Sequence, residues 1–224
     1  MALGWGIGAR LLRWLAVSVV TLGGFFLLAG RWDLPWLWAL GIVASLYGLA
    51  LSLTIDADLA RERSRPGPGG VDRGRQWILS VVVGAQVVVA CLDVGRFHWS
   101  DSVPPALRAA GLLLFAGGYG LVTWSVAVNR FFASVVRVQA DRGHTIIESG
   151  PYHYVRHPGY IGMLLSYGVI GLAIGSWWSL VPGILCLALV LRRALLEDAY
   201  LLEHLHGYRE YATTVPYRLI PGVW

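Results

Sequence analysis

The stretch YIGMLLSYGVIGLAIGSWWSLVPGILCLALVLRRALL, residues 160–196, decides the fold, because its apolar character is almost unbroken. It is too long for one ordinary membrane helix, since a bilayer core needs roughly 20 apolar residues. Small and helix-breaking residues lie near its middle, at Gly175, Ser176, Pro182 and Gly183. We therefore predict two helices joined by a tight turn, which form a helical hairpin within the membrane.

Further apolar runs precede this hairpin, at about residues 11–30, 35–55, 76–94 and 105–129. Each run is long enough to cross a bilayer. The chain of 224 residues is 56% apolar and only 14% charged, and its mean hydropathy is +0.60. Such a composition is typical of proteins whose solvent is largely lipid. The sequence thus predicts an all-α polytopic integral membrane protein with about six transmembrane helices.

The basic side chains indicate how the chain is oriented. All eighteen are arginines, and they lie mainly in the gaps between apolar runs. If the N-terminus is inside, fifteen of them fall on the inner side and three on the outer side. The positive-inside rule then predicts two cytoplasmic termini. The expected partners are membrane lipids rather than nucleic acid, and the arginine-, glycine- and alanine-rich composition suits a bacterial inner membrane. The oligomeric state stays open.

Other features point away from common kinds of site. Cys91 and Cys186 lie inside apolar runs and are expected to be small core residues. His153 and His157 are four residues apart, but prolines flank them and no HExxH motif is present, so no metal site is expected. The Gly- and Pro-rich segment ERSRPGPGGVDRGR, residues 62–75, is predicted to be a flexible connector without a chemical role.

A polar segment, SGPYHYVRHPGYIGMLLS at residues 149–166, lies at the border of the predicted hairpin. The order R-H-P-x-Y at the start of a helix brings free N–H groups and an imidazole to one turn, which suits the polar head of a ligand. Arg193 and Glu197 lie four residues apart near the other end of the hairpin, so they can pair on one helical face. The alternative is that these charges only mark where the helix leaves lipid.

The chain from Asn129 to Trp224 resembles the isoprenylcysteine carboxyl methyltransferase family and the related membrane phospholipid N-methyltransferases. The matching pieces are GHTIIESGPYHYVRHPGYIG, RALLEDAYLLEHLHGYREY and VPYRLIPGVW. The resemblance implies a methyltransferase core over residues 129–224, preceded by transmembrane helices over residues 1–128. It also implies that S-adenosylmethionine is held in a cytoplasmic pocket. The methyl acceptor would be a lipophilic or small carboxylate, amine, phenol or thiol.

The resemblance further implies roles for single residues. A loop that would hold the cofactor largely through its backbone comprises His144, Thr145, Ile146 and Ile147, with an added contact from Gln139. A turn that would line the cofactor pocket comprises Tyr152, His157, Pro158, Gly159 and Tyr160. Glu197 corresponds to the family's cofactor-binding acid and Arg193 to a substrate-side arginine, and both are expected to serve catalysis. Asp198 stands where many members have a second glutamate.

Two alternatives remain at this point. Membrane sterol and steroid reductases share a similar C-terminal architecture and use NADPH, whose 2′-phosphate usually needs arginine neighbours. Arg137, Arg142 and Arg156 would be available for it. The other alternative is a non-catalytic membrane scaffold whose arginines bind anionic lipid. The spacing between the R-H-P-x-Y turn and Glu197 favours methyl transfer.

Overall fold

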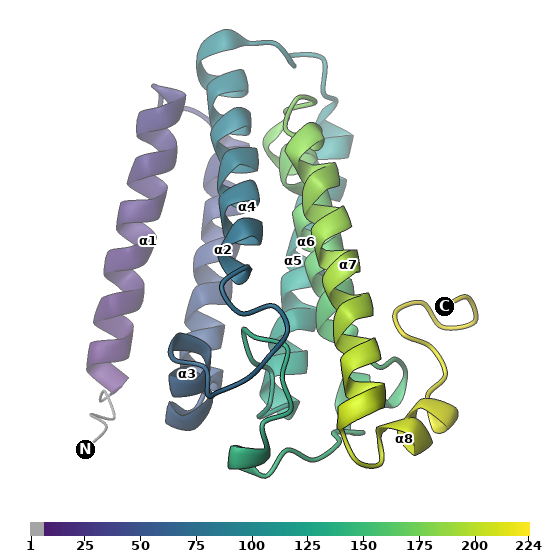
Figure 1. Cartoon of the computed structure of the whole chain (residues 1–224). Helices are drawn as coiled ribbons and strands as arrows, with labels where there is room; N and C mark the ends of the chain where they lie inside the picture. Colours follow the sequence, from purple (N-terminus) through teal and green to yellow (C-terminus); the bar gives the residue numbers. More distant parts are fainter. Residues whose placement is uncertain (1–6) are drawn as a thin grey trace.

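The computed structural model describes residues 7–224, which form a bundle of long helices that run up and down (Figure 1). The long helices are α1 (Ile7–Ala29), α2 (Pro35–Thr54), α4 (Gln76–Leu92), α5 (Pro105–Val128), α6 (Pro158–Ile174) and α7 (Leu180–His204). The shorter elements are α3 (Ala57–Ser64), the π-helical turn η1 (Asp93–Phe97), the 3₁₀ turns η2 (Ala140–Arg142) and η3 (Gly150–His153), and α8 (Tyr208–Thr214). The described residues contain no strand.

The predicted all-α membrane fold class is confirmed, whereas the count of about six transmembrane helices stays a prediction. By length and composition, α1, α2, α4 extended through η1, and α5 can each cross a membrane, and α6 is a shorter apolar helix. The predicted hairpin is present as α6 and α7, which run side by side (Figure 1). Its turn begins at Gly175, whose φ of 106° lies in the left-handed region that favours glycine. Pro182 falls in the first turn of α7, where a missing N–H costs no helical hydrogen bond.

Small residues allow α5 and α6 to approach closely. A Cβ atom on Gly118 would lie 2.6 Å from the Gly162 carbonyl oxygen, and a Cβ atom on Gly162 would lie 2.5 Å from the Gly118 oxygen. The buried Ser166 hydroxyl donates to the Gly162 oxygen at 2.8 Å. Close backbone packing of this kind holds helices together where lipid removes the hydrophobic driving force. It fixes the start of α6 against the end of α5.

Buried polar side chains connect the hairpin to α4. The Asp93 carboxylate accepts hydrogen bonds from the hydroxyls of Ser100 and Ser176, each at 2.5 Å. The Gln86 amide donates to the Tyr167 carbonyl oxygen on α6 at 2.9 Å. Polar groups in an apolar interior are costly unless they are hydrogen-bonded. These contacts therefore fix the position of the hairpin in the bundle.

The connecting segments that carry most polar groups gather at one end of the bundle, called here the loop end. It comprises α3, residues 129–157 and α8, and α1 also begins there (Figure 1). The Gly- and Pro-rich segment predicted to be a flexible connector is instead attached to this end. Val71 donates its N–H to the Val136 oxygen at 3.1 Å, and the Asp72 carboxylate accepts the Val136 N–H at 2.7 Å.

Candidate functional site

A cavity of about 280 Å³ opens at the loop end. This volume is close to the lower limit of small-molecule sites, roughly 300 to 1,000 Å³. Its walls come from α3, α4, residues 129–147, α6, α7 and α8. The residues predicted from sequence that line it are Gln139, His144, Thr145, Ile146, Ile147, Tyr152, His157, Gly159, Tyr160, Arg193 and Glu197. Pro158 is buried as the first residue of α6 and is not among the lining residues.

The Tyr160 hydroxyl connects the two residues predicted to pair on α7. It donates to Glu197 Oε2 at 2.5 Å and accepts from Arg193 Nε at 3.0 Å. The expected direct ion pair between Arg193 and Glu197 is therefore replaced by a bridge through a phenol. Arg193 pairs with Asp72 instead, at 3.2 Å, and donates to the Ser134 carbonyl oxygen at 2.5 Å. One oxygen of Glu197 thus has no partner from the residues described.

Asp198 is the centre of a buried polar cluster beside the cavity. Its carboxylate, 1% exposed, accepts from Arg156 at 2.8 and 3.0 Å and from Arg218 at 2.7 Å. His157 Nε2 lies 3.0 Å from the same carboxylate, and the Tyr208 hydroxyl donates to it at 3.1 Å. The acid fixes the orientation of His157, as a carboxylate does for many functional imidazoles. From sequence, Asp198 was interpreted as a mild departure from the family pattern, at a position where charges could also mark the end of the membrane helix. Its central place in this cluster was not predicted.

The side chains of the predicted cofactor loop bind one another and the neighbouring Phe131. The Gln139 amide is 1% exposed and donates to the Phe131 oxygen at 2.7 Å, and its oxygen accepts from Arg142. The Gln139 N–H donates to His144 Nδ1 at 3.2 Å, and the rings of His144 and Phe131 lie 4.4 Å apart. Burial, together with the charges of Arg142 and Arg137, lowers the pKa of His144 to about 4. A neutral imidazole is what this contact needs, because Nδ1 must accept.

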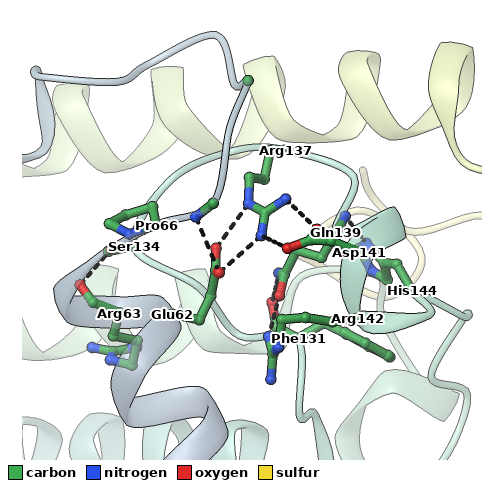
Figure 2. Close-up of polar contacts among 12 residues, drawn as sticks. Glu62, Arg63, Pro66, Phe131, Ser134, Arg137, Gln139, Asp141, Arg142 and His144 are labelled. Carbon is green, nitrogen blue, oxygen red and sulfur yellow. Dashed lines mark hydrogen bonds and ion pairs between the residues drawn. The ribbon is translucent and has the colours of Figure 1, made fainter.

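Ion pairs attach α3 to this loop (Figure 2). The Arg137 guanidinium binds Glu62 through Nε and Nη2, both at 2.8 Å, and Asp141 through Nη1 at 2.7 Å. Arg142 pairs with Asp58 at 2.7 Å. The neighbouring guanidinium of Arg137 lowers the pKa of Glu62. Bidentate pairing of this kind fixes geometry as well as charge, so α3 is held over the loop in one position.

The NADPH alternative loses support from these contacts. It requires Arg137, Arg142 and Arg156 to be available to a phosphate, yet each already binds a carboxylate within the protein. A 2′-phosphate on Arg137 or Arg156 would have to displace the buried carboxylate of Glu62 or Asp198, which costs several kcal/mol by order of magnitude. In residues 7–224, moreover, no group of three His, Cys, Asp or Glu side chains is placed to hold a metal ion.

Comparison with known proteins supports the predicted resemblance. Residues 107–207, a little under half of the chain, match the family model of phospholipid methyltransferases, which confirms the resemblance to membrane methyltransferases. The chain is also 31% identical over 133 residues to the cobalt-zinc-cadmium resistance protein CzcN of Cupriavidus metallidurans. That alignment covers 58% of this chain and 56% of the relative, so the chain spans little more than half of the relative's length. The family match supports membrane methyltransferase activity in general.

Proposed function

Because residues 107–207 carry a phospholipid methyltransferase domain, we propose that the protein transfers a methyl group from S-adenosylmethionine to a lipophilic or small acceptor. The reaction would take place at the cytoplasmic face of a bacterial inner membrane, where both termini would lie. One observation carries this proposal: a single cavity is lined both by the polar loop of residues 139–147 and by the apolar α6–α7 hairpin. Such a cavity suits the meeting of a water-soluble donor with a lipid-borne acceptor.

The residues of the cavity suit the chemical groups of the cofactor. When bound, S-adenosylmethionine would supply an electrophilic methyl group on a sulfonium sulfur. Glu197 has an oxygen left to accept from the cofactor's ammonium group. The rings of Tyr152 and Tyr160 line the same space and favour a cation over the neutral product. The rings of Phe131 and His144, which also line this space, offer aromatic faces for adenine.

Positioning would supply most of the catalysis. Transfer forms a bond between the acceptor atom and the methyl carbon, while the S–CH₃ bond breaks and its electron pair stays on sulfur. Protein groups in such a displacement mainly align donor and acceptor and exclude water. Arg193 would orient the acceptor, and a carboxylate acceptor would need no base. An amine acceptor would have to lose a proton, for which Glu197 or His157 would be the base.

Calorimetric titration of the purified protein tests the cofactor. We expect S-adenosylhomocysteine to bind and NADPH to give no heat of binding. The variant Glu197→Gln should lose most of this affinity, because it removes the charge that would pair with the ammonium group. Glu203→Gln, on the same helix but exposed, is the matched control and should bind as the wild type does. Binding of NADPH alone would favour a reductase, and no binding of either ligand would favour a scaffold.

A pair of variants separates cofactor binding from turnover. His157→Ala should abolish binding of S-adenosylhomocysteine, because it opens the wall of the cavity and removes a partner of Asp198. Arg193→Ala should leave that binding intact and reduce methyl transfer, because its guanidinium is assigned to the acceptor. An equal loss of cofactor affinity in the two variants would contradict this division of roles.

A further inference from the structure

Four arginines line the cavity, and three of them have a carboxylate partner. Arg137 binds Glu62 and Asp141, Arg156 binds Asp198, and Arg193 binds Asp72. Within residues 7–224, Arg63 forms no ion pair. A charge held away from bulk water without a counter-charge is costly, so the fourth arginine needs an explanation.

The surroundings of Arg63 leave most of its donors free. Its Nη1 donates to the Phe132 oxygen at 3.1 Å, and its guanidinium carbon lies 5.9 Å from the centre of the Phe132 ring. No other acceptor from the described residues contacts the guanidinium, which has five N–H donors. Burial lowers the pKa of this side chain, a direction that fits a positive charge with incomplete compensation.

Arg63 from α3 and Arg193 from α7 both line the cavity. Ser134 connects the two elements: its hydroxyl donates to the Arg63 backbone carbonyl oxygen at 3.0 Å, as Figure 2 shows, and its carbonyl oxygen accepts from the Arg193 guanidinium at 2.5 Å. Besides burial, the positive charge of Arg193 also lowers the pKa of Arg63, so the two guanidinium groups lie near each other. The family match begins at residue 107, so it does not include Arg63.

The rest of this part of the cavity is apolar. Leu79 from α4, and Met163 and Tyr167 from α6, line the same space and pack in one cluster with Tyr160. These side chains would surround the hydrocarbon part of a ligand whose head contacts the arginines. The combination of an apolar wall and an uncompensated guanidinium is complementary to an amphiphile with a negative head.

We infer that Arg63, together with Arg193, binds an anionic oxygen group on the methyl acceptor. This inference rests on the proposed function and specifies its substrate: an amphiphile that carries a negative head group beside, or at, the methylated atom. Two sources share this chemistry. The anion is either a carboxylate that itself receives the methyl group, or a phosphate next to a methylated amine.

Binding titrations in nanodiscs of zwitterionic lipid test the anion site without any methyl transfer. The probes share one alkyl chain: N-dodecanoylglycine, its uncharged methyl ester, dodecylphosphoethanolamine and dodecylamine. A charge-assisted hydrogen bond contributes about 1.5–3 kcal/mol, which corresponds to roughly 10- to 150-fold in affinity. We expect N-dodecanoylglycine or dodecylphosphoethanolamine to bind at least about tenfold more tightly than the ester and the amine. The anionic probe that binds more tightly shows whether the site prefers a carboxylate or a phosphate.

Variants assign this preference to Arg63. Arg63→Ala should lose most of the preference for the better anion over the ester and the amine, and Arg63→Lys should keep more of it. Arg61→Ala removes an exposed guanidinium from the same helix and should change nothing. Retained binding of S-adenosylhomocysteine shows that each variant is folded.

The inference is overturned if the wild type binds neither anion more tightly than the ester and the amine, or if Arg63→Ala keeps the full preference. It is equally overturned if Arg61→Ala loses as much affinity as Arg63→Ala. Failure of the proposed function looks different: S-adenosylhomocysteine then does not bind to the wild type, whereas the comparison of the two anions with the ester and the amine still decides whether the anion site exists.

Discussion

Replacing Asp198 by asparagine should destabilise the protein strongly. The side chain is 1% exposed and accepts from two arginines, and Arg156 is itself 6% exposed. Asn keeps the volume but removes the charge and turns one acceptor into a donor that faces guanidinium groups. Breaking a buried pair by removing one partner costs about 3–5 kcal/mol. For a chain of this size that corresponds to a fall in melting temperature of roughly 6–20 °C.

The chain carries a suitable reporter for this measurement. Its two cysteines, Cys91 and Cys186, are both fully buried, as their apolar surroundings predict. A thiol-reactive fluorogenic dye therefore reacts only when the bundle opens, and heating in detergent gives a melting curve. Glu203→Gln is the control, because an exposed substitution stays within about 0.5 kcal/mol and should shift the curve by no more than roughly 2 °C. Should Asp198→Asn melt within that margin, the reasoning about a buried charge cluster is refuted.

Three further outcomes follow from contacts in and around the site. Gly162→Ala should lower the melting temperature, because the added methyl meets backbone at 2.5 Å, whereas Gly117→Ala on α5 meets open space and should not. Tyr160→Phe should weaken S-adenosylhomocysteine binding by roughly 10- to 100-fold in calorimetry, because it removes the hydroxyl that holds the Glu197 carboxylate in position. The folded pKa of His144, about 4, lies below its usual 6.5, so the unfolded chain takes up the proton first. Its contribution to stability is present above pH 6.5 and is lost as the pH falls toward 4, and His144→Gln should show a flatter melting-temperature profile over that range.

The architecture could be predicted from sequence because its cause is local. Each long helix contains a mainly apolar run, and the hairpin turn is marked by Gly175 and Ser176. The length of an apolar run compared with the thickness of a bilayer needs no knowledge of distant contacts. The same holds for the two cysteines, whose burial follows from their neighbours along the chain.

The candidate site could be predicted only in part, because its contacts are distant in sequence. Spacing placed Arg193 and Glu197 on one helical face, but it could not reveal that the Tyr160 hydroxyl would lie between them. The role of Asp198 depends on Arg218, twenty residues later, and on Arg156, forty-two residues earlier. Periodicity within a helix carries no information on such pairs.

The segment before residue 76 shows most clearly where composition misleads. Glycine, proline and charge in residues 62–75 are typical of a solvated linker, yet Glu62 and Asp72 are 5% and 8% exposed and bind arginines of the site. Glu62 and Asp72 are held in place by partners beyond residue 130, and the composition of a segment gives no information on such distant contacts. The division at residue 128 was predicted from the motifs that follow it, whereas the family match begins at residue 107 and the cavity takes walls from both sides of the division, including Arg63 and Leu79. Recognition of the acceptor is consequently expected to depend on Arg63 from the N-terminal half as well as on Arg193, and cofactor binding on the C-terminal half.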